Sequence, residues 1–213
     1  MMEDNKLITS YGTGLEEKGK KTIQSLELKA VPGESIFLYG NVGRRQVHFE
    51  VLAGQRQPDS GDIILNGDSI YECLDIPSLR REKIGIIPRN GGLIPEITML
   101  EQIVLPMKLS GWPMERITER VKKITGGHLP LHDLYNKPAR CSMRKQAIAA
   151  ILRALVMEPK VLLINGYLDD FEELDSEILW DVISRYRSPE NILVYFSGAP
   201  ASDQIAWTQQ IKL

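Results

Sequence analysis

The chain has 213 residues, of which 43% are hydrophobic and 25% are charged, proportions that suit one large globular domain. A formal net charge of −2 and an isoelectric point near 6.0 give no basic excess, which argues against a nucleic-acid-binding protein. Two distant cysteines, Cys73 and Cys141, fit a reducing cytosol better than a disulfide scaffold. No apolar run approaches the length of a membrane span and the first residues lack a signal-peptide pattern, so we expect a cytoplasmic protein.

The first strands are predicted to form an antiparallel layer. Residues 6–11 are typical of a short strand that ends at an aromatic residue, and the polar, glycine-bearing residues 12–21 are typical of a loop. Residues 22–28 alternate between apolar and polar side chains, as a half-buried strand does. A turn at residues 31–34 then leads into the apolar residues 34–38, which form the next predicted strand.

A glycine-bearing turn follows this strand and precedes a predicted helix, which is the context of a phosphate-binding loop. A working loop reads G-x-x-x-x-G-K-[ST]: the glycines let backbone N–H groups close on phosphate, the lysine meets the β- and γ-phosphates, and the hydroxyl holds Mg²⁺. Gly40 and Gly43 keep this frame. Arg45, Gln46 and Val47 stand where the second glycine, the lysine and the hydroxyl belong, and two glycines after a strand are by themselves more often an ordinary turn.

Further turns and strands are predicted up to residue 92. Residues 57–61 are a predicted turn and residues 62–65 a strand, which the dipeptide Asn66-Gly67 ends as a strong hairpin signal. Residues 84–88 are typical of a core strand, and residues 89–92 of the loop that leaves it.

The pattern becomes helical from Thr98. Thr98 and Glu101 form a predicted capping box for a helix with apolar residues at helical spacing through residue 107. A second helix is predicted over residues 117–124, and two glycines follow it. A helical insertion from about residue 95 to 140 is the economical interpretation.

The last part of the chain returns to alternating helices and buried strands. A helix capped by Ser142 is predicted to run through residue 155 and to stop before Pro159. The other predicted elements are buried strands at 161–164 and 192–196, a helix at 178–186, and an edge strand or coil at 207–213.

The order of these elements, with the phrases between them, resembles the nucleotide-binding domain of ATP-binding cassette (ABC) transporters, of the lipoprotein-releasing and macrolide-exporter type. The resemblance implies an α/β fold: a P-loop NTPase-like (RecA-like) core at 1–94 and 141–213 with an N-terminal antiparallel β layer, and an inserted helical subdomain at about 95–140. It is carried by residues 52–54, 58–61, 66–67, 84–85, 93–95, 98–103, 137–138, 153–155 and 159–163.

The resemblance also assigns working positions, and most of them hold other residues than the family's lysine, glutamine, acidic pair and switch histidine. The catalytic positions hold Gln46, Arg89, Asn165, Gly166 and Gly198. The nucleotide-binding positions are Tyr11, Gly40, Asn41, Val42, Gly43, Arg44, Arg45, Gln46, Val47 and His48. The signature, which in the family completes the site of a facing cassette, is represented by Ser142, Met143 and Arg144. No metal ligand is expected.

Four of these positions have competing interpretations. Tyr11 either stacks on adenine or simply packs. Arg44 and Arg45 either replace the missing cation, lie on the solvated surface, or pair with Asp169 and Asp170. For the signature serine, a helix cap alone is favoured over contact with phosphate.

The predicted function is a cassette that has lost its catalytic residues, a pseudo-ATPase with a structural or regulatory role. One missing transition-state donor typically lowers the rate by roughly 10²–10³, and here several are replaced. The resemblance implies transmembrane permease subunits and another cassette, in a homo- or heterodimer, as partners at the inner face of the cell membrane. It leaves open ATP or ADP held without Mg²⁺, and no nucleic acid is expected. The alternative is a divergent ATPase that binds ATP and hydrolyses it slowly with groups from a partner.

Overall fold

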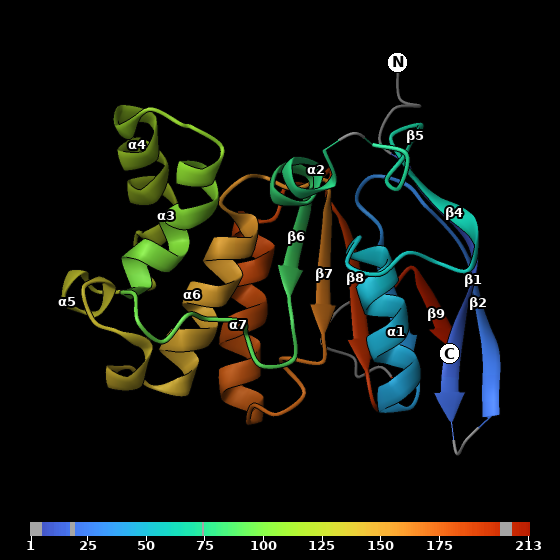
Figure 1. Ribbon diagram of the computed structural model, residues 1–213. Coiled ribbons are helices and arrows are strands. Elements are labelled where there is room, and N and C mark those ends of the chain that lie inside the picture. The colour runs from blue at the N-terminus through green and yellow to red at the C-terminus, as the bar shows by residue number, and fades with distance from the viewer. Residues whose placement is uncertain (1–5, 18–19, 74, 201–205) are drawn as a thin grey trace.

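The computed structural model describes residues 6–17, 20–73, 75–200 and 206–213, which form two sheets and a set of helices (Figure 1). One sheet is antiparallel and lies at one end of the molecule, the other is parallel and central, and a group of helices lies at the opposite end. Within the described ranges, no helix has the length and apolar character needed to cross a membrane.

The antiparallel sheet is larger than the sequence predicts. It has the order β2-β1-β4-β5, with β1 at Leu7–Glu17, β2 at Lys20–Ala30, β4 at Ser60–Leu65 and β5 at Asp68–Ser69. The loop predicted at residues 12–21 is wrong, because β1 and β2 pair from Leu7↔Ala30 to Glu17↔Lys20. A Cβ on Gly12 would lie 2.9 Å from the hydroxyl of Ser60, so this glycine marks a close approach of β4 rather than a loop.

The parallel sheet has the order β6-β7-β8-β3-β9 and separates two hydrophobic clusters. Its strands are β6 at Ile84–Ile87, β7 at Val161–Asn165, β8 at Ile192–Ser197, β3 at Ser35–Tyr39 and β9 at Gln209–Lys212. Successive side chains of a strand point to opposite faces. Ile36, Leu38 and Val194 therefore belong to the cluster shared with the antiparallel sheet, and Phe37 and Tyr195 to the other.

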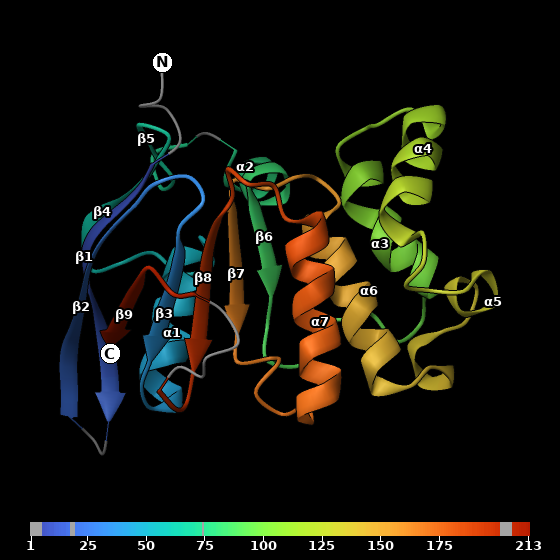
Figure 2. The ribbon, with the colours of Figure 1, turned by 180° about the vertical axis from the view of Figure 1, so that it is seen from behind.

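Helices cover the two faces of the parallel sheet unequally. Helix α1, Val42–Leu52, packs in the cluster shared with the antiparallel sheet, whereas α6, Met143–Leu155, and α7, Glu173–Tyr186, pack in the other cluster. In Figure 2, α6 and α7 lie toward the β6 end of the sheet, and no described helix crosses in front of β8 or β3. Part of that face is therefore left without a helical cover.

The remaining helices lie mostly at the far end of the molecule. They are α3 at Met99–Leu109, α4 at Met114–Thr125, α5 at Leu131–Leu134 and a 3₁₀ turn at Pro138–Arg140, and their apolar side chains join the cluster of α6 and α7. Helix α2, Ile76–Lys83, was not predicted, because it buries no residue and carries no apolar stripe. Whether residues 95–140 form a subdomain of their own stays a prediction, since they share this hydrophobic cluster.

The predicted local signals at the ends of these elements are confirmed. Thr98 and Glu101 form the reciprocal capping box of α3. Asn66 and Gly67 have φ of 59° and 88° and join β4 to β5 as the hairpin turn. The Oγ of Ser142 accepts a hydrogen bond from a backbone N–H of the first turn of α6.

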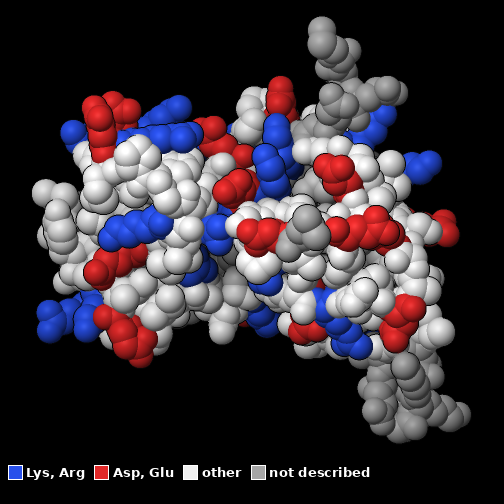
Figure 3. All heavy atoms as spheres, turned by 45° about the horizontal axis from the view of Figure 1, so that its top comes forward, with Lys and Arg blue, Asp and Glu red and all other residues white. Residues whose placement is uncertain are grey.

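Charged side chains of both signs are interspersed over the face shown in Figure 3, which has no continuous field of one sign. This agrees with a net charge of −2 over the whole sequence.

Candidate functional site

The turn predicted to cradle phosphate is wound into helix α1. The helix begins at Val42, and its N-cap is Asn41, whose Oδ1 accepts a hydrogen bond from the backbone N–H of Arg44 at 2.9 Å. The backbone carbonyl of Asn41 accepts from the N–H of Arg45 at 3.0 Å. These two N–H groups are therefore engaged by the cap. Gly40 lies before the helix. A Cβ on this glycine would come within 3.0 Å of Leu213 Cβ, so the residue that follows the last strand, β9, packs against Gly40.

The next two positions of the loop are occupied by internal contacts. The Oε1 of Gln46 accepts a hydrogen bond from Asn165 Nδ2 at 2.8 Å, and its Nε2 donates to Glu50 Oε1 at 2.9 Å. Val47 is buried and offers no oxygen to a metal. Gln46 and Asn165, two predicted positions from separate elements, are thus brought together, but as a neutral hydrogen-bonded pair.

Tyr11 and His48 form a buried pair between β1 and α1. Tyr11 is 3% exposed and His48 1%, and the phenol oxygen lies 2.8 Å from Nδ1 of the imidazole. Burial lowers the pKa of His48 to about 4, and the nearby Arg44 charge contributes; burial also raises the pKa of Tyr11 well above its usual range. The packing interpretation of Tyr11 describes the structure, because its ring is not open to a stacked base.

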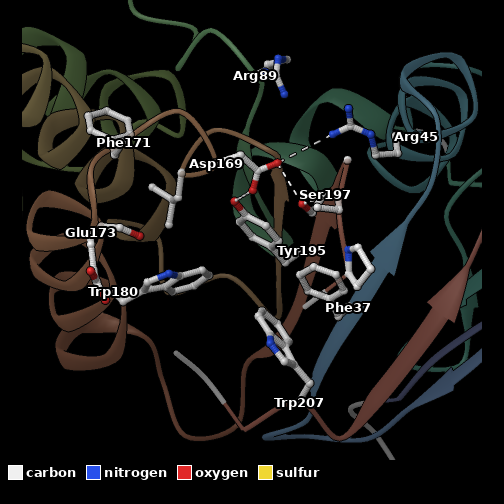
Figure 4. Close-up of a pocket in the computed structure, with 15 residues that line it drawn as sticks. Phe37, Arg45, Arg89, Asp169, Phe171, Glu173, Trp180, Tyr195, Ser197 and Trp207 are labelled. Atoms are coloured by element: carbon white, nitrogen blue, oxygen red, sulfur yellow. Dashed lines mark hydrogen bonds and ion pairs between the residues drawn. The ribbon is translucent and has the colours of Figure 1, made fainter. Parts of the chain in front are cut away.

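Arg45 turns its guanidinium away from solvent toward the carboxyl ends of the parallel strands (Figure 4). Its Nη1 lies 4.0 Å from Asp169 Oδ2, and Asp169 also accepts hydrogen bonds from the hydroxyls of Tyr195 at 2.6 Å and Ser197 at 3.0 Å. Desolvation lowers the pKa of Arg45, an effect that the Asp169 charge opposes. Of the interpretations considered for Arg45, pairing with Asp169 is the one the structure contains.

Glycines at the ends of β7 and β8 make room for this cluster. A Cβ on Gly166, whose φ is +60°, would lie 3.0 Å from Nη1 of Arg45 and 3.0 Å from Nη1 of Arg89. The Nη2 of Arg89 donates to both carboxylate oxygens of Asp170 at 3.0 Å. Gly198 lies on the other side, with Nη2 of Arg45 3.4 Å from the position of its missing Cβ.

These residues do not fit Mg²⁺–ATP. The N–H groups of Arg44 and Arg45 are bonded to Asn41, position 47 has no hydroxyl, and position 166 has no carboxylate. In the described ranges, no three His, Cys, Asp or Glu side chains gather as a metal site would need.

The signature-like residues begin helix α6. Ser142 caps the helix at a long distance of 3.4 Å, and the side chain of Met143 is largely exposed. Arg144 forms a salt bridge with Asp175 at 2.8 Å. Met143 shares a groove of about 200 Å³ with Arg89 of the predicted catalytic positions. The favoured cap is therefore observed, and the alternative of contact with phosphate stays untested.

A further hollow was not predicted from the sequence. It is a pocket of about 630 Å³ over the face of the parallel sheet that carries Phe37 and Tyr195 (Figure 4). Its aromatic side chains come from positions dispersed over the whole chain, so no local motif marks it. The one usable signal is the strand period, which places Phe37 and Tyr195 on the same face. Its lining residues include Phe37, Arg45, Arg89, Asp169, Glu173, Trp180, Tyr195, Ser197 and Trp207.

Comparison with known proteins gives consistent similarities. Residues 23–165 match the family model described as "ABC transporter". The chain is 26% identical over 188 residues to the lipoprotein-releasing system ATP-binding protein LolD of Geobacter metallireducens, covering 87% of this chain and 83% of the relative.

Two solved structures share the fold. The ATP-binding cassette MJ0796, a dimer bound to ADP and Pi, superimposes with a TM-score of 0.77 at 18% identity, over 91% of this chain and 88% of that one. The structure of cbiO1 from Clostridium perfringens, described as part of the ABC transporter complex cbiONQ, gives a TM-score of 0.73 at 19% identity, over 92% and 80%. The predicted α/β class, with an antiparallel and a parallel sheet, is confirmed.

Proposed function

The chain belongs to the ABC transporter family and resembles its ATP-binding subunits, and from this premise we propose that it is a cassette without hydrolytic activity of its own. Its role is then structural or regulatory: it docks on transmembrane permease subunits at the cytoplasmic face of a membrane and pairs with another cassette. The names of its relatives support these partners, since one belongs to a lipoprotein-releasing system and another to a multisubunit transporter complex.

The observation that carries the proposal is the position of Arg45. Its backbone N–H is bonded to the carbonyl of Asn41, and its side chain is buried against Asp169. The segment that would bind phosphate thus makes the first turn of α1 and sends a cation into the protein interior. Beside it, Gln46 and Asn165 satisfy each other, and neither contributes a charge.

Catalysis of phosphoryl transfer depends on positioned charges around the transferred group and its metal. With no carboxylate at Gly166 and no hydroxyl at Val47, no described residue at these positions polarises water or holds Mg²⁺. The lysine, the metal ligand and the carboxylate act together in catalysis, so their effects on the rate are lost together. We therefore expect ATP hydrolysis by this chain to be indistinguishable from the uncatalysed background.

The test is calorimetric titration of the purified chain with ATP and ADP, with and without Mg²⁺, together with a phosphate-release assay. We expect no Mg²⁺-dependent binding and no turnover. Nucleotide binding that does not depend on Mg²⁺ would leave a nucleotide-sensing cassette, and absence of binding would leave a scaffold. Mg²⁺-dependent turnover by the isolated chain would overturn the proposal.

A matched pair of variants tests the reason for inactivity. Gln46→Lys with Val47→Ser restores the lysine and the hydroxyl but leaves Arg45 in place, so we expect no gain of Mg²⁺–ATP affinity. Adding Arg45→Gly removes the buried cation and frees the turn, so affinity should rise only in the triple variant. Equal affinity in the double and triple variants would show that Arg45 does not block the loop.

Partner binding is tested by co-purification with transmembrane subunits and with a candidate second cassette. If such a mixture gave Mg²⁺-dependent turnover that disappears on Ser142→Ala or Arg45→Ala, the divergent-ATPase alternative would hold instead.

A further inference from the structure

The pocket of about 630 Å³ has the size and lining of a small-molecule site. It lies over Phe37 of β3 and Tyr195 of β8, with Trp180 of helix α7 and Trp207 also in its lining. The phosphate-loop positions belong to α1, which packs against the opposite face of the same sheet. The pocket therefore extends beyond the predicted nucleotide-site positions, of which it shares Arg45, Arg89 and Gly198.

Four aromatic rings form the floor of the pocket (Figure 4). The ring of Trp207 lies 4.9 Å from Phe37, 5.9 Å from Tyr195 and 6.0 Å from Trp180, measured between centroids. Tyr195 stacks on Phe37 at 5.8 Å with 19° between the planes. Such a floor favours a flat, apolar ligand body, because rings gain from both area burial and offset or edge contacts.

One end of the pocket holds the guanidiniums of Arg45 and Arg89, with the carboxylates of Asp169 and Asp170 beside them. In the structure as described, Nε and Nη1 of Arg45 have no hydrogen-bond acceptor, although the side chain is buried. Nη1 of Arg45 and Nη1 of Arg89 each lie 3.0 Å from the same point beside Gly166, so the two guanidiniums converge to within 6.0 Å. Buried donors without acceptors are costly, and a ligand oxygen would satisfy them.

The acidic groups around the pocket define the orientation of a ligand. Asp169 already accepts hydrogen bonds from two hydroxyls, and both carboxylate oxygens of Asp170 accept from Arg89. Glu173 lies on the side of the pocket opposite Arg45 (Figure 4). A ligand carboxylate is thus repelled from the Glu173 end, and at the other end it meets the Nε and Nη1 donors of Arg45 that lack acceptors.

We propose that this pocket binds a planar aromatic carboxylate, with its ring system on Trp180, Trp207, Phe37 and Tyr195 and its carboxylate at Arg45 and Arg89. Its volume accommodates two or more fused rings. A carboxylate suits this end, because a planar guanidinium donates to both of its oxygens. The proposal does not depend on whether the cassette binds nucleotide.

The probes are 2-naphthoate and its neutral isostere 2-naphthamide, titrated into the full chain by calorimetry and by quenching of tryptophan fluorescence. We expect saturable binding of the carboxylate, at least about tenfold tighter than that of the amide, as a charge-assisted hydrogen bond gives. Trp207→Phe should reduce the quenching amplitude. Trp112→Phe should not, since Trp112 lies outside the pocket beneath Arg116 at 3.6 Å.

Variants assign the anion preference to the arginine end. Arg45→Gln should bring the carboxylate and amide to within about threefold of each other, whereas the matched Arg116→Gln should keep the difference. If circular dichroism shows that Arg45→Gln does not fold, Arg89→Gln, at a 44% exposed side chain, makes the same test. No binding of either probe, or equal binding of both by the unaltered chain, would overturn the proposal.

Discussion

The Tyr11–His48 pair makes the stability of this fold depend on pH. His48 is 1% exposed, and its ring nitrogen Nδ1 lies 2.8 Å from the Tyr11 oxygen. Burial, together with the nearby charge of Arg44, lowers the pKa of His48 to about 4 in the folded chain, against an ordinary value of 6.5. The folded protein therefore resists protonation of this imidazole over a pH range in which the unfolded chain accepts the proton.

The sign and size of the effect follow from proton linkage. The contribution of neutral His48 is fully present above pH 6.5 and is lost as the pH falls from 6.5 to about 4, because the unfolded state binds more protons in this window. At about 1.4 kcal/mol per pH unit, the whole window is worth roughly 3 kcal/mol, and the part between pH 6.5 and 5 about 2 kcal/mol. The pKa of His128 is also lowered by burial, so it adds a loss of the same sign.

Urea unfolding at pH 7.5 and pH 5.0 measures this loss. His48→Gln keeps a polar side chain near Tyr11 but cannot titrate, so its free energy of unfolding should fall by about 2 kcal/mol less than that of the unaltered chain. His132→Gln is the matched control, since that side chain is 75% exposed, and it should keep the full pH dependence. Equal pH dependence in His48→Gln and the unaltered chain would refute the reasoning.

Other substitutions test the contacts around the candidate site and the fold. Arg45→Leu should cost about 1–3 kcal/mol by leaving Asp169 without its counter-charge, and in a double-mutant cycle with Asp169→Asn the two costs should not add; strict additivity would exclude the pair. Asn41→Ala should lower the free energy of unfolding by about 1 kcal/mol through loss of the α1 cap, and an unchanged urea midpoint would contradict that role. Gly61, with φ of +77°, has the carbonyl of Ser10 where a Cβ would lie, whereas a Cβ at Gly67, with φ of +88°, meets nothing within 4 Å. Gly67→Ala should therefore lower the free energy of unfolding by about 1–2 kcal/mol and Gly61→Ala clearly more, as thermal melts would measure.

Local signals in the sequence predicted much of the fold. The capping box of Thr98 and Glu101 was readable because both partners lie within one turn. The Asn66-Gly67 turn was readable because each residue adopts positive φ at little cost. Helix α2 was not predicted because it buries no residue, and the signals that mark it, the N-cap Asp75 and a proline in the first turn, are both at its start.

Long-range contacts were not predictable in the same way. The sequence around Tyr11 is equally compatible with stacking on adenine and with packing in the core, and only the structure pairs this residue with His48. For Arg45 three environments were compatible with the sequence, because the choice depends on how close the ends of β3, β7 and β8 bring Asp169. Gly12 and Gly14 are typical of a loop in the sequence, because glycine is frequent in turns and also where a neighbouring strand comes close, as β4 does at Gly12.

Arg45 belongs both to the first turn of α1 and to the lining of the aromatic pocket, so the proposed lack of hydrolysis and the proposed ligand site share one residue. The backbone of Arg45 belongs to the capped first turn of α1. Its guanidinium lies beside Gly166 and Gly198, at the ends of β7 and β8, and not in the loop before α1. A Cβ at Gly166 would crowd the guanidinium at 3.0 Å, and a Cβ at Gly198 would lie in contact with it at 3.4 Å. The residues at 45, 166 and 198 therefore depend on one another in this structure, because the guanidinium of Arg45 lies beside both glycines. Restoring a carboxylate at 166 alone would crowd Arg45 and Arg89 and would not restore a nucleotide site.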